Sequence, residues 1–390
     1  MTDDPRERAE QRTLLMPRRD TGGALAAGQR LQEYVIERLL GVGGYSIVYL
    51  ARDTRLDRRV ALKEFLPATL ALRAPDGQIV PRLPRFADAY DKGLQGFVNE
   101  ARLLGQFDHP ALLKVHRFWQ ERGTAYMAMP YYEGITLARW LGDLGTPPSE
   151  RWLRQLADAL MDALETMHAK RCWHRDVAPD NILMLYDRAE AGAYLEQPPR
   201  PVLLDFGAAR RVIGDATQTL TAVLKSGYSP LEQYESEAPQ RQGPWTDVYA
   251  LSAVLYTAAT GLVPAASVSR VVHDALVPAR VAAQGRYGVA LLDAIDAGMA
   301  LRPADRPPSI EALRRRLDSR HAAAPRSAAE AAAAAAASPS PSPSSSPPPA
   351  ATAAAAAAPS PTAAGLRHWW PVALGAALLL AAIVYRWLRA

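Results

Sequence analysis

The stretch that decides the fold is residues 174–181, which read His-Arg-Asp-Val-Ala-Pro-Asp-Asn. A second stretch, residues 202–207, reads Val-Leu-Leu-Asp-Phe-Gly. Three segments earlier in the chain complete the pattern: a glycine-rich turn, a strand with a lysine and a helix with a glutamate. The order of these five segments carries more information than any one of them.

The glycine-rich turn covers residues 41–48, Gly-Val-Gly-Gly-Tyr-Ser-Ile-Val, and follows a strand-like segment at 34–40. In such a turn, backbone N–H groups can approach phosphate oxygens without obstruction from side chains. A tight hairpin without a ligand would give the same pattern. This segment alone therefore leaves both interpretations open.

A lysine and a glutamate follow the turn. Lys63 lies in the strand-like segment 60–64, where it is placed to pair with nucleotide phosphates while Ala61 leaves room for an adenine ring. Glu100 lies in residues 96–107, whose apolar positions recur at helical spacing. Because a buried lysine needs a counter-ion to stay charged, we predict a Lys63–Glu100 ion pair. The alternative is that both side chains are solvated.

Together the five segments resemble the eukaryotic-like (Hanks-type) protein kinase family, and more closely its bacterial serine/threonine kinases. The resemblance covers about residues 34–317, and its narrower part rests on 227–234 (Gly-Tyr-Ser-Pro-Leu-Glu-Gln-Tyr) and 64–68 (Glu-Phe-Leu-Pro-Ala). It implies an α+β, bilobal kinase domain at residues 31–320. A small β-rich lobe would occupy about 31–130 and a large helical lobe about 131–320.

The resemblance also assigns roles to single residues. It implies that Asp176 is the catalytic base, which accepts the proton of the substrate hydroxyl. Asn181 and Asp205 would hold Mg²⁺, with Mn²⁺ as an alternative, and Lys63 and Glu100 would complete the catalytic set. The residues expected to contact ATP are Gly41, Val42, Gly43, Gly44, Val48, Ala61, Lys63, the gatekeeper Met129, Pro130 and Tyr132.

Three structural features follow from the same resemblance. The C=O of Pro130 and the N–H of Tyr132 should read the edge of adenine, and proline is tolerated there because only its N–H is missing. Asp247 should brace the backbone of the catalytic loop. Arg306 should pair with Glu232, a pair that favours a protein kinase over a small-molecule phosphotransferase.

One departure puts activity in question. Ala178 stands where the family has a lysine that steadies the γ-phosphate. One interpretation is a pseudokinase, a nucleotide-binding signalling scaffold without turnover. We favour another, in which Lys225, placed where serine/threonine kinases have a threonine next to the catalytic aspartate, substitutes for the absent lysine. The alternative for Lys225 is a solvent-facing side chain without a catalytic role.

Regulation by phosphorylation is a further expectation. Arg175, next to the catalytic aspartate, is the type of residue that pairs with a phosphate on the activation loop. The candidate autophosphorylation sites are Thr217, Thr219, Thr221 and Ser226.

The two ends of the sequence differ from the middle. Residues 1–30 are rich in charge, lack the apolar core of a signal peptide and predict a flexible arm. Residues 321–366 form a linker of Ala, Pro and Ser, where prolines are too dense for a helix. Residues 369–388 predict one transmembrane helix with aromatic flanks. This anchor would hold the kinase domain at the cytoplasmic face of the cell (inner) membrane, and its small residues permit a homodimer.

Composition sets outer limits on these expectations. Of 390 residues, 49% are hydrophobic and 32 are proline, which indicates segments of unlike character. The net charge of +5 is too small to indicate binding to nucleic acid. The single cysteine, Cys172, excludes an intrachain disulfide and is expected to be a buried, inert thiol. Nucleic acid is therefore not an expected partner. The expected partners are ATP and protein substrates, as the resemblance implies, and the membrane.

Overall fold

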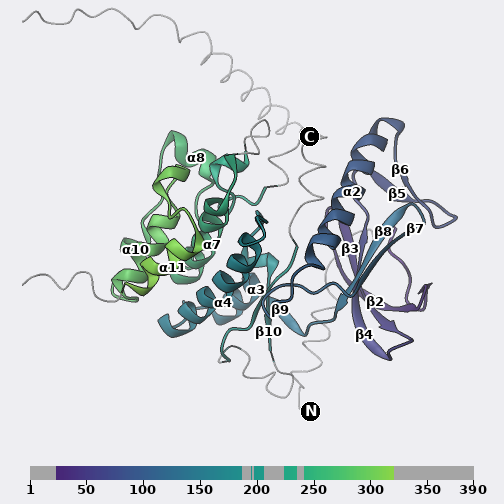
Figure 1. Cartoon of the computed structure of the whole chain (residues 1–390), viewed down its shortest axis with the longest axis horizontal. Coiled ribbons are helices and arrows are strands. Elements are labelled where there is room, and N and C mark those ends of the chain that lie inside the picture. The colour runs from purple at the N-terminus through teal and green to yellow at the C-terminus, as the bar shows by residue number, and fades with distance from the viewer. Residues whose placement is uncertain (1–22, 187–194, 196, 206–223, 235–240, 320–390) are drawn as a thin grey trace, which may run out of the picture. The chain divides into compact units, whose positions relative to one another are not determined.

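The computed structural model of the chain describes residues 23–186, 195, 197–205, 224–234 and 241–319 (Figure 1). The predicted linker, the predicted membrane helix, Phe206 and the three candidate threonines lie outside the described residues. Within the described part, no helix combines the length and the apolar character needed to cross a membrane.

An antiparallel sheet of six strands, in the order β1-β2-β3-β4-β8-β7, forms the first half of the described chain. Its strands are β1 (Arg30–Leu31), β2 (Tyr34–Val42), β3 (Ser46–Asp53), β4 (Arg58–Phe65), β7 (Arg117–Glu121) and β8 (Thr124–Pro130). Strand β8 is buried from Thr124 to Met129, because it is apolar almost throughout and lies inside the sheet beside β4. A hairpin of β5 (Ala71–Arg73) and β6 (Ile79–Pro81) leads to helix α2 (Ala87–Leu104), which packs on the sheet (Figure 1).

Helix α2 begins earlier than the sequence predicts. The apolar spacing indicates a helix over 96–107, whereas the structure extends it back to Ala87 and ends it at Leu104. The added turns carry several charged residues, which hide the buried positions Ala89, Tyr90 and Gly93 from a periodicity argument.

The packed part of the chain begins before residue 31. Leu25, which falls in the predicted flexible arm, is 6% exposed, and the C=O of Gly23 accepts a hydrogen bond from Arg73 Nε at 2.7 Å. The same guanidinium donates through Nη2 to both carboxylate oxygens of the buried Glu64, at 2.7 Å each. The hairpin that carries Arg73 thus ties residues 23–25 to the sheet.

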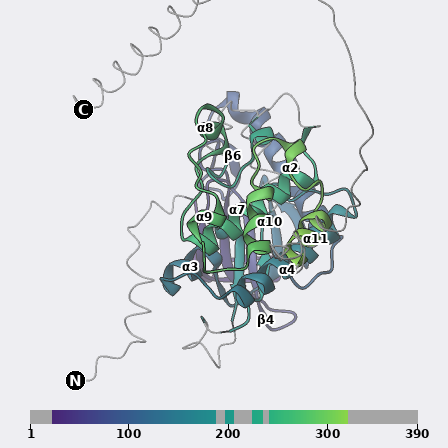
Figure 2. The ribbon, with the colours of Figure 1, turned by 90° about the vertical axis from the view of Figure 1, so that its left-hand side faces the viewer.

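Helices dominate the second half. They are α3 (Leu137–Leu144), α4 (Glu150–His168), α7 (Pro244–Thr260), α8 (Ser267–Val272), α9 (Ala279–Ala282), α10 (Val289–Gly298) and α11 (Ile310–Asp318). Helix α7 is apolar almost throughout and is buried on nearly all sides, with α4, α10 and α11 packed around it (Figure 2). Pro244 opens α7, and Gly261 ends it with a left-handed φ of 75°.

A small sheet positions residues 174–181 and Asp205. It pairs β9 (Gly134–Thr136), β10 (Ile182–Leu185) and β11 (Pro201–Leu203) in the order β11-β10-β9. Strand β10 directly follows residues 174–181, and β11 lies just before Asp205. Because Ile182 pairs with Leu203 in antiparallel register, Asn181 and Asp205 come to the same end of this sheet.

Candidate active site

Lys63 is the point where three elements meet. It lies on β4, and its Nζ is 3.3 Å from Glu100 Oε1 on α2 and 2.6 Å from Asp205 Oδ1, just beyond β11. Successive side chains of a strand point to opposite faces, so Lys63 faces this site while Glu64 faces Arg73. Lys63 is 5% exposed, so its ammonium is held almost out of water between two carboxylates.

The two carboxylates decide the charge of this lysine. Burial alone would lower the pKa of Lys63, but the Asp205 and Glu100 carboxylates outweigh that effect and hold its pKa above the ordinary value. The site therefore keeps a permanent cation, which is what binding of a phosphate chain requires.

The glycine-rich turn between β2 and β3 is open where a ligand would approach. A Cβ added at Gly41 or Gly44 would meet no atom within 4 Å, and neither residue has a positive φ. The fold itself therefore does not require glycine at these two positions. Glycine at these positions would instead allow a phosphate chain to approach the backbone closely, so the turn fits the expected nucleotide.

Strand register brings the other expected nucleotide contacts together. In the sheet, Val48 pairs with Lys63, and Ala61 pairs with Met129 across β4 and β8. Pro130 ends β8, and Tyr132, which is partly exposed, follows in the connection to β9. Lys63 and Ala61 are two residues apart on β4 and so share one face of the sheet with their partners Val48 and Met129.

Asp247 braces the catalytic loop, as predicted. Its carboxylate, fully buried on α7, accepts the N–H groups of His174 at 2.8 Å and Arg175 at 2.7 Å, and His168 Nε2 lies 2.8 Å from it. Burial raises the pKa of Asp247, but the hydrogen bonds from His168 and from the backbone outweigh it and leave the pKa below its usual value. The brace matters because Arg175 has a left-handed φ of 64°, a strained conformation for a residue with a Cβ.

Asn181 orients Asp176. Its Nδ2 donates to the backbone C=O of Asp176 at 2.9 Å and to the carboxylate Oδ2 at 2.7 Å. The backbone C=O of Asn181 in turn accepts the N–H of Leu204 at 2.9 Å, which fixes the neighbouring Asp205 beside the loop. Amide and carboxylate oxygens at one end of a sheet suit Mg²⁺. Among the described residues, no cluster of three or more His, Cys, Asp or Glu side chains is placed to hold a metal ion, so a site here would rely on Asn181, Asp205 and phosphate oxygens.

His174 is a buried, neutral part of the same loop. The N–H of Asp176 donates to its Nδ1 at 3.3 Å, which requires an unprotonated nitrogen at that position. Burial lowers the pKa of His174 to about 4, and the charge of Lys225 acts in the same direction. The imidazole is therefore a hydrogen-bond acceptor that supports the backbone before Asp176.

The side chain of Lys225, in the segment 224–234, extends toward residues 174–181. Its Nζ lies 2.7 Å from Asp180 Oδ1 and 3.8 Å from Asp176 Oδ1, and its side chain is only 15% exposed. The methyl group of Ala178 is fully buried in the same loop. The lysine head thus lies beside Asp176 and Asp180 and is mostly shielded from solvent.

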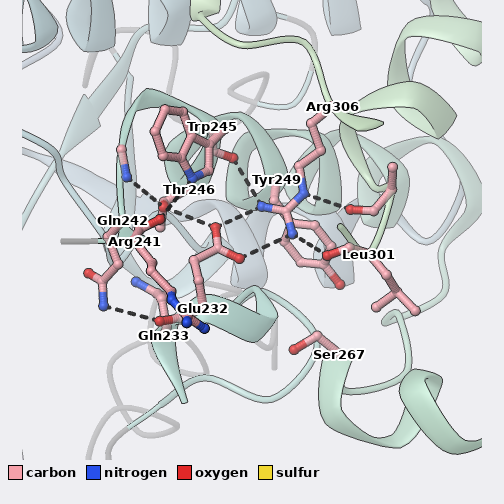
Figure 3. Close-up of polar contacts among 12 residues, drawn as sticks. Glu232, Gln233, Arg241, Gln242, Trp245, Thr246, Tyr249, Ser267, Leu301 and Arg306 are labelled. Atoms are coloured by element: carbon pink, nitrogen blue, oxygen red, sulfur yellow. Dashed lines mark hydrogen bonds and ion pairs between the residues drawn. The ribbon is translucent and has the colours of Figure 1, made fainter. Parts of the chain in front are cut away.

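The predicted Glu232–Arg306 pair is confirmed (Figure 3). Arg306 donates to the two carboxylate oxygens of Glu232 at 2.8 and 3.2 Å. Its guanidinium also donates hydrogen bonds to the backbone carbonyls of Ala300, Leu301 and Trp245. Thr246 at the start of α7 donates to the same carboxylate at 3.0 Å. Since both charged groups are buried and multiply hydrogen-bonded, the segment 224–234 is fixed at this end.

Sequence reasoning missed three residues of this region. His168 supports Asp247, Asp180 holds Lys225, and Gln233 donates through Nε2 to the C=O of Arg175 at 2.8 Å. The sequence offered no signal for Asp180, because an acidic residue in a polar loop has many equivalent explanations. Cys172 is buried, as predicted, and burial raises the pKa of its thiol to about 11.

Comparison with known proteins agrees with this geometry. Residues 34–284 match the family model described as protein kinase domain. The chain is 30% identical over 325 residues to the serine/threonine-protein kinase pkn3 of Myxococcus xanthus, covering 77% of this chain and 53% of that protein. It is 32% identical over 289 residues to PknD of Mycobacterium tuberculosis, covering 72% and 38%. The chain thus spans about half the length, or less, of these curated relatives.

Solved structures give the same result. A structure of PpkA-294 in its apo form is 40% identical, with a TM-score of 0.68, and the match covers 76% of this chain and 100% of that one. The kinase domain of Mycobacterium tuberculosis PknI, at 24% identity and a TM-score of 0.53, covers 75% and 100% and supports the fold alone. These matches confirm the resemblance inferred from the sequence and the two-lobed arrangement of strands and helices.

Proposed function

Since the chain belongs to the protein kinase family, as a relative of bacterial serine/threonine kinases, we propose that it transfers the γ-phosphoryl group of ATP to serine and threonine hydroxyls of proteins. The observation that carries the proposal is the buried Lys63–Glu100 ion pair, formed in a site that also holds Asp205. Removing a lysine and two carboxylates from water carries a large desolvation penalty. Such buried charge clusters are typical of functional sites, and a phosphate-binding site would explain this one.

The residues divide the chemistry among themselves. Lys63 would bind phosphate oxygens of ATP, and the open turn at Gly41–Gly44 would let backbone N–H groups approach the same chain. Asp176, oriented by Asn181, would accept the proton of the substrate hydroxyl as its oxygen bonds to the γ-phosphorus and the bond to the leaving ADP oxygen breaks. Mg²⁺ or Mn²⁺, held by Asn181 and Asp205, would offset negative charge on the phosphates.

A nucleotide-binding scaffold without turnover is the second candidate, and Ala178 is the observation that favours it. A scaffold would need the phosphate-binding residues but neither a base nor an amide that orients it. The Asn181–Asp176 hydrogen bond therefore favours the enzyme.

Phosphotransfer to a generic basic protein tests the proposal. The full chain with Mg²⁺ and radiolabelled ATP should label serine and threonine of that protein. Asp205→Ala should reduce labelling by about 100-fold or more, because the metal ion that would offset the phosphate charge loses a carboxylate ligand. Equal labelling by both proteins would mean that a contaminant is responsible. No labelling by the wild-type chain would contradict the proposal.

Autophosphorylation belongs to the same proposal. The buried Nε of Arg175 has no hydrogen-bond partner in the described part of the chain, so a phosphate on the activation segment would give it one. Ser226 is the candidate acceptor that the structure describes, and Thr217, Thr219 and Thr221 precede it in the sequence.

We also propose that residues 369–388 anchor the chain in the cell membrane as a single pass, with the kinase domain in the cytoplasm where ATP and Mg²⁺ are abundant. The support is the uncharged apolar run from Trp369 to Tyr385, and its small residues would allow a homodimer. The full chain should sediment with membranes and resist extraction by high salt, whereas a chain ending at residue 366 should be found in the soluble fraction. Sedimentation of both chains alike would contradict the anchor.

A further inference from the structure

The catalytic loop contains no cation of its own after Arg175. Residues 176–181 read Asp-Val-Ala-Pro-Asp-Asn, and the short side chain of Ala178 cannot reach a phosphate. Transfer of a phosphoryl group spreads negative charge over its oxygens, and fixed positive charge near them lowers the barrier. A kinase with this loop needs a positive charge from another segment.

Lys225 has the geometry to supply it. Its ammonium is 3.8 Å from the Asp176 carboxylate, too far for a hydrogen bond but within ion-pair distance. The 2.7 Å contact with Asp180 is the shorter one and determines where the ammonium lies. Asp180 is 61% exposed and Lys225 only 15%, so an exposed carboxylate holds the lysine head at the inner end of the loop.

We propose that Lys225 is a catalytic residue that contacts the γ-phosphoryl group during transfer, and that Asp180 is the positioning residue that holds its ammonium beside Asp176. This inference rests on the proposed kinase function and concerns the same site. The bonds made and broken are those of the proposed transfer. Lys225 neither gains nor loses a proton and acts only as a positive charge and hydrogen-bond donor to the phosphate oxygens.

The arrangement also couples activity to the segment 224–234. That segment is anchored at its far end by Glu232 on Arg306 and by Gln233 on the C=O of Arg175. A change that shifts the segment would withdraw Lys225 from the loop, whereas a lysine at position 178 would have stayed. Placement of this one segment therefore controls a component of the catalytic site.

Replacement of Lys225 is the first test. Lys225→Ala should lower kcat by one or more orders of magnitude, because removing one group that stabilises transition-state charge typically costs about 100- to 1,000-fold. The Kd for ATP, measured by calorimetry, should change far less than kcat. Lys92→Ala is the matched control, because that lysine pairs with an exposed aspartate on α2 at 2.8 Å and should leave both quantities unchanged.

Chemical rescue separates loss of charge from loss of folding. In Lys225→Cys, alkylation of the thiol with 2-bromoethylamine creates a side chain of lysine length with a terminal ammonium. Cys172 is the only other cysteine, is buried, and has a thiol pKa raised to about 11, so it should not react. Treatment should restore most of the lost kcat in Lys225→Cys and none in Lys225→Ala.

A double-mutant cycle tests the role of Asp180. Asp180→Asn should lower kcat in the wild-type background and have little further effect when Lys225 is already alanine, because its role acts through that lysine. A merely structural aspartate would reduce activity by the same factor in both backgrounds. The swap Ala178→Lys with Lys225→Thr should retain more activity than Lys225→Thr alone.

The outcomes are distinguishable. A wild-type chain without transfer contradicts the proposed function itself. If the wild type is active, Asp176→Ala is inactive and Lys225→Ala keeps the wild-type kcat, the function stands and the inference about Lys225 is overturned. Failure of aminoethylation to restore kcat in a folded, fully modified Lys225→Cys protein would also overturn it.

Discussion

At the scale of single residues, the catalytic loop depends on groups whose charge is set by burial. Asp247 remains ionised without contact to water because three N–H groups surround its carboxylate. His174 remains neutral because burial disfavours the charged form of its imidazole. The backbone before Asp176 is thus held by one anion, Asp247, and one neutral hydrogen-bond acceptor, His174. Protonation of either group would loosen the loop.

This predicts a specific sensitivity to acid. The pKa of His174 is about 4 in the folded chain, below its ordinary value of 6.5, so its stabilising effect is fully present above pH 6.5 and is lost as pH falls toward 4. As the pH falls across this range, protonation of His174 in the unfolded chain should lower the free energy of unfolding by up to about 3 kcal/mol. Urea denaturation of the wild type and of His174→Phe at several pH values measures the effect.

The comparison should be made on slopes, because the substitution itself also changes stability. Between pH 6.5 and 4 the free energy of unfolding should fall more steeply for the wild type than for His174→Phe, because phenylalanine at position 174 does not titrate. Parallel slopes for the two proteins would show that His174 is not the group responsible.

At the scale of elements, helix α7 connects the catalytic loop to the segment 224–234. Its first turns carry both Thr246, which donates to Glu232, and Asp247, which braces the loop. Arg306, from the connection before α11, completes the junction through Glu232 (Figure 3). A rigid, almost wholly buried helix therefore fixes both parts of the site at once.

The buried pair at this junction should be worth far more than a surface pair. Arg306→Met leaves Glu232 buried without its partner and should lower the free energy of unfolding by about 3–5 kcal/mol. Arg315→Met, which breaks the exposed pair with Glu311, should cost less than about 1 kcal/mol. Chemical denaturation of both variants measures the difference, and similar losses for the two would refute the special role of the buried pair.

The same elements show what a sequence can and cannot predict. The Lys63–Glu100 pair was predictable because a lysine in an apolar strand needs a buried counter-ion, and the Glu232–Arg306 pair was predictable because the kinase resemblance implies it. The contact between Lys225 and Asp180 was not, because an exposed aspartate in a polar loop has many equivalent explanations. The early start of α2 was hidden by charged residues on its exposed face.

At the scale of the whole molecule, the described chain combines a strand-rich half that carries Lys63 with a helix-rich half that carries the loop of Asp176. The 2.6 Å contact between Lys63 and Asp205 joins the two. Under the proposed function neither half would hold a complete site, because the phosphate-binding lysine would come from one and the base and metal ligands from the other. The central claim is therefore that this combined site turns over ATP and does not merely bind it.

The most direct test measures binding and transfer on the same full-length protein. ATP affinity is determined by calorimetry, and phosphate incorporated into the chain itself by intact mass spectrometry after incubation with Mg²⁺ and ATP, for the wild type and Asp176→Ala. We predict that both proteins bind ATP with similar affinity and that only the wild type acquires phosphate. ATP binding by the wild type without any phosphate on the chain or on an added protein substrate would contradict the account.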